Sequence, residues 1–460
     1  MDYAQQPVAS LAQTVLAGTQ PCPMCGRPAP ADQYGFIECR CGWGGPDDPV
    51  ESARGASRWL TLLDRRLAST IARGELARIA RTKNVSSGRH LLYIAMLSAL
   101  SVAIYLIVAG LLVGSVVLLA QLAMDGVWLG VVLDGGIVLY LLWTLFGIPT
   151  RVDVIVAPLT DYPKLATLLA EVAQAVGAKA PKWVILFPGA NFYVIRRMLW
   201  GRALTPQVAL GVGVACLAQM DDRELRAVLA HELAHYQHEH TFFGRFFAGA
   251  EAALHNIIDG MRAGIETNYK ERYQVRRTNS ASLATMIGVL IVWVVTLPLR
   301  LLWFVFHLLR MRLSRADEYE ADATAIEAYG AQAFINGLTA VLATDATLRG
   351  ARQSIRQEMA KHNNPNFFSE LRRHYAELPA SYLGPMRIKT LRGYRTLEDT
   401  HPITPDRIRA AFLLGAPEPS ATYAPQSAHD IITPAGASDA SAIERQLTDM
   451  LFAAPSRRKG

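Results

Sequence analysis

A run of 30 uncharged residues, Leu91 to Ala120, limits the folding of this chain more than any other feature of its sequence. The run consists mostly of Leu, Val, Ile and Ala. As a helix it is long enough to cross the hydrocarbon layer of a membrane, which is about 30 Å thick. A water-soluble domain would need a core that surrounds such a helix on every side. We therefore predict a transmembrane helix here.

A second apolar stretch, Val127 to Ile148, follows almost at once and is interrupted only by Asp134. Because residues 121–126 leave room only for a short turn, the two stretches predict an integral membrane helical hairpin over residues 91–150. The composition agrees, because 18% of the residues are charged, against about 25% in soluble domains. It also excludes a disordered chain, a collagen-like chain and a disulfide-rich secreted scaffold.

Basic residues cluster immediately before the first apolar run. Residues 51–90 contain nine basic and three acidic residues, and so carry +6 of the formal net charge of +7. Lys and Arg are enriched on the cytoplasmic side of membrane helices. We interpret residues 51–90 as a basic juxtamembrane segment in contact with the lipid bilayer. A hairpin returns the chain to its starting side, so the N-terminus and the residues after 150 are both expected in the cytoplasm. No nucleic-acid partner is expected.

Four of the five cysteines form two close pairs near the N-terminus, Cys22 with Cys25 and Cys39 with Cys41. Two such pairs can supply four thiolates to a tetrahedral zinc ion. Disulfides are the alternative, but no signal peptide precedes the pairs to direct them to an oxidising compartment. We therefore predict a structural zinc ion in a zinc ribbon over residues 1–50, with a role left open. The fifth cysteine, Cys216, lies in an apolar run and is expected in a core.

The sequence His231-Glu232-Leu-Ala-His235 predicts a catalytic metal site. Asp221 and Glu224 can cap the start of a helix, and apolar residues then recur at helical spacing. On that helix His231 and His235 lie one turn apart on one face, where both can bind one zinc ion. The adjacent Glu232 can act as general base on a water molecule.

A catalytic zinc ion needs a third protein ligand and an open position for water. Glu318 and Asp322 lie four residues apart in an acidic segment, so a helix would place them on one face. Glu318 can be the third ligand, while Asp322 can orient a ligand histidine. Taken alone, the segment would be an ordinary acidic helix start. In combination with the histidine motif we interpret it as part of the site.

In these motifs the chain resembles the HtpX-like membrane zinc metallopeptidases, relatives of the CAAX prenyl protease. Three segments carry the resemblance: residues 221–235, residues 314–322 and the His401-Pro-Ile-Thr-Pro-Asp-Arg407 segment. It covers about residues 90–415, and so leaves the cysteine pairs and the last 45 residues outside. Asn191-Phe192-Tyr193 is similar to a segment that begins an edge strand in this family, although Phe192 replaces a small residue there.

The resemblance implies a gluzincin-type zinc metalloendopeptidase that hydrolyses protein or peptide substrates at the cytoplasmic face of the inner membrane. Membrane proteins, especially misfolded ones, are the substrates it suggests. The implied roles are metal ligand for His231, His235 and Glu318, general base for Glu232, orientation of a ligand for Asp322, stabilisation of the oxyanion for Arg407 with His401, and substrate binding for Asn191 and Phe192.

The expected fold class is mainly α within an α+β chain: a zincin-like helical domain with a small sheet, joined to the membrane hairpin and the zinc ribbon. Residues 151–415 are expected to form the peptidase domain, with a helix at 163–176 and a strand at 183–187. Residues 416–440 are rich in Ala, Pro and Ser and predict a linker. A short helix is expected over residues 442–452.

The apolar stretch from Ser282 to Leu309 raises a question of sidedness. If it crossed the membrane once, Glu318 would lie on the opposite side from His231 and His235, unless residues 241–265 also crossed. We expect a helix near 282–309 that dips into the membrane without spanning it. A protein with four spans is the alternative.

Two other classes of function compete with a peptidase. A non-catalytic adaptor would bind zinc and recruit partners through the ribbon, but the intact Glu232 argues against it. A zinc transporter is less favoured, because the histidine motif lies far from the two confident spans. The oligomeric state is not predicted.

Overall fold

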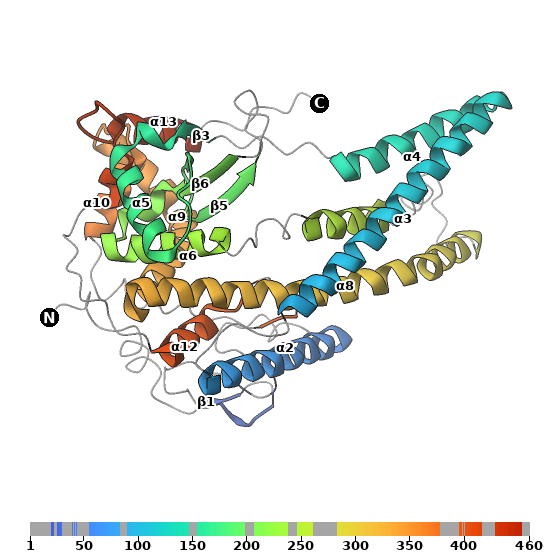
Figure 1. Cartoon of the computed structure of the whole chain (residues 1–460), viewed down its shortest axis with the longest axis horizontal. Coiled ribbons are helices and arrows are strands. Elements are labelled where there is room, and N and C mark those ends of the chain that lie inside the picture. The colour runs from blue at the N-terminus through green and yellow to red at the C-terminus, as the bar shows by residue number, and fades with distance from the viewer. Residues whose placement is uncertain are drawn as a thin grey trace. The chain divides into compact units, whose positions relative to one another are not determined.

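The computed structural model describes residues 20–22, 25–29, 39, 41, 43, 55–82, 90–146, 154–197, 207–237, 246–260, 283–377, 395–397, 399, 401–415 and 428–452. The described residues are mostly helical, with a small mixed sheet (Figure 1). The chain forms two compact units. The first comprises residues 1–86, 152–241 and 315–460, and the second comprises residues 87–151 and 242–314.

The sheet of the first unit has four strands in the order β3-β4-β6-β5. The strands are β3 (Ile155–Pro158), β4 (Trp183–Phe187), β5 (Phe192–Arg197) and β6 (Gln207–Gly213). β3 and β4 are antiparallel, β4 and β6 are parallel, and β6 and β5 are antiparallel. β5 therefore lies at one edge of the sheet.

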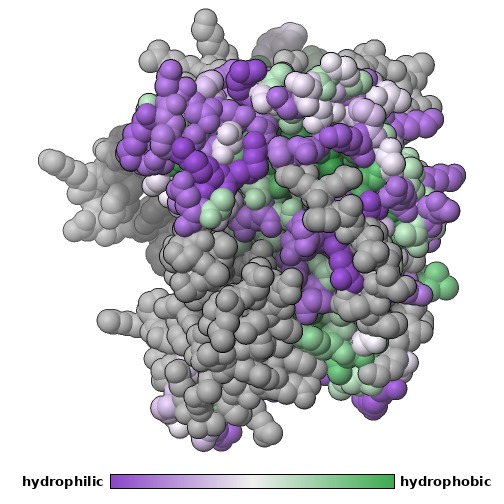
Figure 2. Space-filling model, turned by 90° about the vertical axis from the view of Figure 1, so that its left-hand side faces the viewer, coloured by the Kyte–Doolittle hydropathy of each residue, from purple (hydrophilic) through white to green (hydrophobic). Residues whose placement is uncertain are grey.

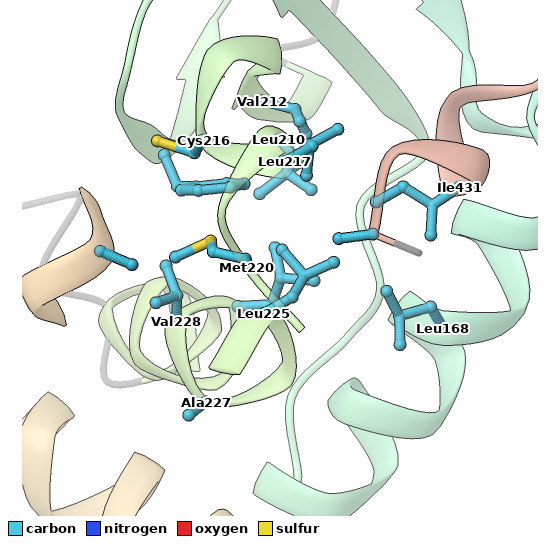
Figure 3. Packing of buried hydrophobic residues seen from close by; sticks show 14 of the residues in the cluster. Leu168, Leu210, Val212, Cys216, Leu217, Met220, Leu225, Ala227, Val228 and Ile431 are labelled. Atoms are coloured by element: carbon cyan, nitrogen blue, oxygen red, sulfur yellow. The ribbon is translucent and has the colours of Figure 1, made fainter. Parts of the chain in front are cut away.

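Helix α5 (Pro163–Val176) packs its apolar face into the core of the first unit. Pro163 stands at its first turn, where a missing amide costs nothing, and Gly177 ends it with φ 71°, a left-handed conformation that favours glycine. The bounds of α5 and β4 confirm the elements expected at 163–176 and 183–187. Figure 3 shows Leu168 of this helix facing the same core as Leu210, Val212 and Met220.

Helix α6 (Asp222–Gln237) begins with a reciprocal capping box. The amide of Glu224 donates to Asp221 Oδ1 at 2.7 Å, and the amide of Asp221 donates to Glu224 Oε2 at 3.3 Å. Leu225, Leu229 and Leu233 are fully buried along one face. Cys216 is also fully buried, as expected, in the short helix η4 (Val214–Ala218) that precedes α6.

Helix α9 (Ala331–Lys361) packs against α6. The contact depends on Gly337, because a Cβ atom there would lie 2.8 Å from the carbonyl oxygen of Glu224 and 2.8 Å from a methyl group of Val228. A side chain at this position would push the two helices apart. The close approach fixes α6, and with it the histidine motif, against the body of the first unit.

Helix α8 (Leu283–Tyr329) is longer than the helix expected near 282–309. It continues through Pro298 and ends only before Gly330, which has φ 88°. The residues between Arg310 and Tyr329 contain no glycine or proline, so nothing in that segment stops the helix. The apolar stretch of the sequence ends at Leu309, but the helix continues for another 20 residues with a more polar composition.

The C-terminal part of the first unit contains α10 (Phe367–Glu377), α12 (Thr404–Leu414), η5 (Ala428–Ile432) and α13 (Ser441–Phe452). The helix expected over 442–452 is present as α13. Residues 428–440, which we expected within a linker, instead belong to the core, because Ala428, Ile431 and Ile432 are buried against α5 and its neighbours. The linker was predicted from the Ala- and Pro-rich composition, and these three residues were too few to change that prediction.

The second unit contains α3 (His90–Met124), α4 (Trp128–Phe146), a helix at residues 246–260 and the first part of α8. α3 and α4 pack together and are joined by a tight turn at Gly126, which has φ 71°. The hydroxyl of Tyr105 donates to the carbonyl of Phe246 at 3.0 Å, and that of Tyr140 donates to the carbonyl of Asn256 at 2.6 Å.

Among the described helices, α3 alone is long and apolar enough to cross a membrane by length and composition. Many of its large apolar side chains are exposed in the structure, as are many of those on α4. The face of the molecule in Figure 2, in contrast, is mostly hydrophilic where its residues are described. That α3 and α4 span a membrane as a hairpin stays a prediction.

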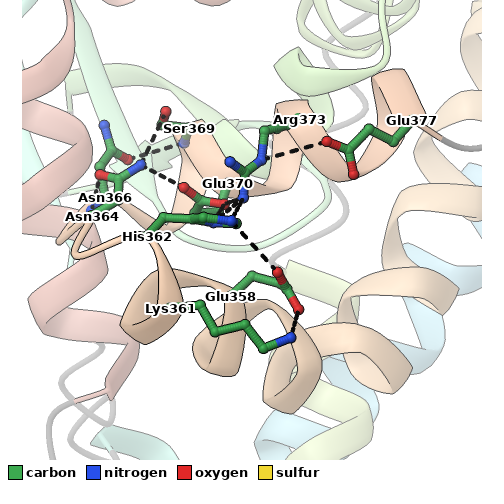
Figure 4. A network of polar contacts seen from close by, with 9 residues as sticks. All are labelled: Glu358, Lys361, His362, Asn364, Asn366, Ser369, Glu370, Arg373 and Glu377. Atoms are coloured by element: carbon green, nitrogen blue, oxygen red, sulfur yellow. Dashed lines mark hydrogen bonds and ion pairs between the residues drawn. The ribbon is translucent and has the colours of Figure 1, made fainter.

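A polar network joins the end of α9 to the start of α10 (Figure 4). Its centre is Glu370, which is 4% exposed. Asn364 donates to Glu370 Oε1 at 2.8 Å, Arg373 donates to Oε2 at 2.5 Å, and His362 Nδ1 lies 3.1 Å from Oε2. Burial alone would raise the pKa of Glu370, but these three contacts outweigh it and hold the pKa below the ordinary value of 4.5.

We expect Glu370→Gln to lower the melting temperature of the protein by about 4 °C at pH 7, and by progressively less below pH 4.5. A carboxyl whose pKa is lowered by folding stabilises the protein above its unfolded-state pKa, and this contribution disappears as the pH falls through the folded-state pKa. Thermal unfolding of both proteins between pH 7 and pH 3 measures the difference. Glu377→Gln is the control, because Glu377 is mostly exposed at the end of the same helix. A difference that stays constant with pH would contradict the assignment.

Candidate metal centre

Helix α6 places two histidine side chains side by side. His231 and His235 are one turn apart, and their Nε2 atoms are separated by 3.2 Å. Their rings meet edge to face, with centroids 4.7 Å apart. His231 is buried and His235 is partly buried. A helix that is capped at Asp221 and packed along its leucine face holds both rings in one direction.

Glu318 of α8 completes a triangle of donor atoms. Its Oε1 lies 3.3 Å from His235 Nε2, and its Oε2 lies 3.7 Å from His231 Nε2. Donor atoms that bind one zinc ion tetrahedrally at 2.0–2.2 Å stand roughly 3.3–3.6 Å apart. The three separations fit one such ion, and two imidazoles with a carboxylate are a ligand set that zinc prefers in catalytic sites.

Asp322 and Arg407 fix the orientation of His231. Asp322 Oδ1 lies 3.0 Å from His231 Nδ1, so a proton on Nδ1 leaves Nε2 free to face the metal position. Arg407 of α12 donates to both oxygens of Asp322, at 2.9 and 2.5 Å. A bidentate pair of this kind is rigid, because the guanidinium plane matches the carboxylate. Asp322 is completely buried, which strengthens the pair.

Arg407 also sets the charge balance of the centre. Its Nη1 lies 3.4 Å from Glu318 Oε2, and its Nη2 lies 3.4 Å from His231 Nε2. Burial opposes ionisation of Glu318, yet the charge of Arg407, with hydrogen bonds from His235 and His401, holds the pKa of Glu318 well below its usual range. The carboxylate is therefore ionised, which is the form that can bind a metal ion.

Glu232 follows His231 in the sequence and is partly buried. Burial raises its pKa above the ordinary value for a glutamate, although the nearby charge of Arg407 opposes the shift. A carboxylate with a raised pKa is a stronger base, which suits a group that must accept a proton near neutral pH.

His401 stands at the open side of the centre. Its side chain is 62% exposed, and its Nδ1 lies 2.7 Å from Glu318 Oε1. It is the only histidine of the centre with a mostly exposed ring, and it precedes α12, which carries Arg407. The structure therefore brings both residues of the His401–Arg407 segment next to Glu318, one from the solvent side and one from the buried side.

Asn191 and Phe192 lie at the start of β5, on the edge of the sheet. Asn191 is exposed, and its Oδ1 accepts a hydrogen bond from the amide of Phe192 at 2.9 Å. The ring of Phe192 is 3% exposed and packs in the core. The side chain of Phe192 therefore has a structural role, and Asn191 is the exposed residue at this end of the edge strand.

Two residues beside the centre were missed by the sequence analysis. The ring of Phe334 on α9 lies 5.6 Å from the guanidinium of Arg407 and 6.3 Å from the ring of His231. Asp406, which is 1% exposed, accepts hydrogen bonds from Nη2 and Nε of Arg395 at 2.5 and 2.6 Å. A single Phe in an apolar helix gives no indication that it lies near a metal centre. The pairing of Arg395 with Asp406 could not be predicted either, because one sequence does not show which distant residues are in contact.

The cysteine pairs converge on a second cluster of donor atoms. Cys22 Sγ lies 3.5 Å from Cys41 Sγ, and Cys25 Sγ lies 3.4 Å from Cys39 Sγ. None of the five cysteines forms a disulfide. Four thiolates around one zinc ion at 2.3 Å would stand roughly 3.8 Å apart, so a small outward movement accommodates the ion. A two-stranded antiparallel ribbon of β1 (Gln20–Pro21) and β2 (Pro28–Ala29) flanks the first pair, Cys22 and Cys25, in the sequence.

The chain is similar to known proteins over the residues that form this centre. Residues 160–412 match the family model described as peptidase family M48. The chain is 25% identical over 252 residues to Protease HtpX of Legionella pneumophila (strain Lens), covering 55% of this chain and 76% of that protein. Among solved structures, Ste24p of S. mikatae shares 17% sequence identity with a TM-score of 0.31, and the match covers 71% of this chain and 67% of that one.

Proposed function

The chain belongs to peptidase family M48, whose members are zinc-dependent metallopeptidases, and from this premise we propose that it is a membrane-bound zinc endopeptidase acting at the cytoplasmic membrane face. One observation carries the catalytic part of the proposal. The donor atoms of His231, His235 and Glu318 lie at the separations that one zinc ion requires, and Glu232 follows the first of them.

Each side chain of the centre has a different role in the proposed hydrolysis. A zinc ion bound by His231, His235 and Glu318 would supply Lewis acidity to the attacking water and to the carbonyl of the peptide bond. Glu232 accepts a proton from the water and returns it to the leaving amine. Arg407, with His401 at the open side, stabilises negative charge that develops on the substrate oxygen. Asp322 keeps the ring of His231 in the orientation that binding requires.

The edge of the sheet supports an extended substrate. Among the described strands, β5 pairs only with β6, so its outer edge can accept the backbone of a peptide as a further strand. We propose that Asn191 and the backbone of Phe192 bind substrate at the start of this edge. Backbone hydrogen bonds of this kind do not depend on the side chains of the substrate, so the edge could accept many sequences.

The membrane location rests on α3, on the exposed apolar side chains of α3 and α4, and on the +6 charge of residues 51–90. Apolar side chains exposed over whole helices are characteristic of a surface in contact with lipid. We propose that α3 and α4 cross the cytoplasmic membrane and that both the N-terminus and the catalytic residues face the cytoplasm. Membrane proteins that are misfolded are the proposed substrates, as in membrane-protein quality control.

Cysteine-accessibility probes test the number of crossings. Single cysteines placed between residues 266 and 280, which lie outside the described residues, are expected to react only with reagents that reach the cytoplasm. Probes in the turn at residues 121–126 are the control and should react from the opposite side. Labelling of both sites from outside the cell would favour the four-span alternative over our version.

A second zinc ion is proposed in the cysteine cluster. We expect purified protein to contain two zinc ions per chain and Cys39→Ser to contain one, because three remaining thiols bind zinc far less tightly than four. Elemental analysis after gel filtration measures the content. Cys216→Ser is the matched control and should retain both ions, since Cys216 lies in the core of the peptidase and not in the cluster. Two ions in Cys39→Ser would contradict the site.

A non-catalytic adaptor remains the alternative function, favoured only by the separate cysteine cluster. Comparison of the protein content of cells that carry the active chain or its Glu232→Gln variant distinguishes the two functions and identifies substrates. A peptidase predicts membrane proteins that accumulate in the variant cells. An adaptor predicts no difference.

A further inference from the structure

Helix α2 (Gly55–Thr82) lies outside the segment that matches the peptidase family, yet one face of it is covered by the first unit. The residues of this face recur at intervals of three and four and are buried or half-buried: Leu62, Arg65, Ser69, Ala72, Leu76 and Ile79. The interval is that of one continuous helical face. Figure 1 shows α2 beside α12, and the two helices are in contact.

The C-terminal half of this face reaches the residue next to a metal ligand. Ile79 is completely buried in a small cluster with Tyr319 and Ala410. Tyr319 follows Glu318 on α8 and is 3% exposed. The two neighbouring side chains therefore point to different places, Glu318 to the metal centre and Tyr319 to α2. Any displacement of Ile79 acts on the turn of α8 that carries the ligand.

The middle of the face is connected, through Arg395 and Asp406, to the residue that precedes Arg407. The hydroxyl of Ser69 lies 3.4 Å from Nη1 of Arg395, and the carboxylate of Asp64 accepts from the amide of Leu397 at 3.2 Å. Arg395 makes the buried bidentate pair with Asp406, and Asp406 precedes Arg407 on α12. The first turn of α12 is thus held between α2 on one side and Asp322 on the other.

The N-terminal end of the face reaches the cysteine cluster. Leu62 packs against a small core formed by Cys22, Ala29, Cys39 and Trp43. A ribbon of this size has too little core to fold without a metal ion or a partner. The contact gives α2 a second anchor in addition to the peptidase residues.

We propose that α2 is a positioning helix for the metal centre, and that the zinc-bound cysteine cluster anchors it. The inference rests on the proposed function, because it assumes that His231, His235 and Glu318 bind a catalytic zinc ion. Ile79 and Ser69 are positioning residues: they touch neither metal nor substrate and act through Tyr319 and Arg395. Residues that orient metal ligands commonly change metal affinity or activity by about 10–100-fold when they are replaced.

The test measures zinc affinity by chelator competition in the full-length protein. Ile79→Ala is expected to weaken binding at the histidine–glutamate site about 10-fold, and Ile79→Val by less. Glu318→Gln protein, which keeps only the cysteine site, supplies the baseline that separates the two ions. Arg73→Ala, on the exposed face of α2, should leave the affinity unchanged. Unchanged affinity in folded Ile79→Ala protein would overturn the proposal.

A second variant separates positioning from general loss of stability. Leu447 is completely buried in α13, far along the chain from the metal ligands, and Leu447→Ala should destabilise the fold about as much as Ile79→Ala. It is expected to keep full zinc affinity. An equal loss of affinity in both variants would overturn the role of α2. If Ile79→Ala does not fold, Ile79→Val still provides the comparison, because it removes a single methylene group.

Amide hydrogen exchange tests the anchor. Cys39→Ser is expected to speed exchange in α2 and in the first turn of α12 at least several-fold, while exchange in α5 stays unchanged. Unchanged exchange in α2 would overturn the anchoring role of the cluster. These readouts do not depend on catalysis, so an inactive enzyme with normal coupling would count against the proposed function alone.

Discussion

Replacing Glu232 with Gln is expected to slow peptide hydrolysis about 10³-fold and to leave the zinc content unchanged. The amide keeps the size of the side chain but has no basic oxygen, so the attacking water retains its proton. The Nε2 atoms of His231 and His235 and the oxygens of Glu318 are not altered, so the metal position keeps all its ligands. Turnover of a protein substrate by purified protein in detergent, with elemental analysis of the same samples, measures both quantities.

The outcome of this experiment separates the functions. Lost activity with full zinc content identifies Glu232 as the base. Loss of zinc together with activity would instead assign Glu232 to the metal site, and undiminished activity would refute the mechanism. Glu224→Gln is a useful control, because Glu224 lies two turns earlier on α6 and serves the capping box. It should affect stability rather than turnover.

Replacing Glu318 with Gln is expected to weaken zinc binding at the histidine site by at least about 100-fold and to reduce activity to background. A neutral amide oxygen is a poorer ligand than a carboxylate. The substitution also removes the negative charge that faces Arg407 and His401, so the buried cation would repel the metal ion. Zinc affinity and turnover, measured on the same preparation, check the prediction.

The control for this variant is Glu320→Gln, which changes a partly exposed carboxylate on the same helix. It should retain zinc and activity. If Glu318→Gln kept its zinc and its turnover, the third ligand would have to be another residue. If both variants lost zinc equally, the effect would reflect the acidic charge of the helix as a whole.

Local patterns made α6 predictable. The capping box at Asp221, the leucines at helical spacing and the two histidines one turn apart are all contained in 15 residues, so helical geometry alone determines their arrangement. Helix α5 was predictable for the same reason, since Pro163 starts it and Gly177 ends it. Glu318 could be predicted as the third ligand only in combination with the histidine motif, because no local pattern joins residues that far apart, and the family resemblance supported the same assignment.

Packing between distant segments was not predictable. Residues 51–90 were interpreted only as a charged segment beside a membrane, because basic residues dominate their composition. Residues 55–82 form α2, and small residues such as Ser69 and Ala72 make up much of its buried face. Small side chains give a weak apolar signal, yet they allow close contact between helices. The burial of Ile431 and Ile432 was not predicted for a similar reason, since two apolar residues do not make a periodic pattern.

The contact of Ser69 with Arg395 joins residues 326 positions apart, and this separation sets an order of events during synthesis. At 5–20 residues per second, α2 leaves the ribosome roughly 16–65 s before Arg395 is made. Throughout this interval the face of α2 lacks its contacts with Arg395 and α12, so this part of the nascent chain is exposed to chaperones and to aggregation. Arg407 is the last residue of the centre to be translated, so the contacts around Glu318 and Asp322 cannot all form until nearly the whole chain has been made.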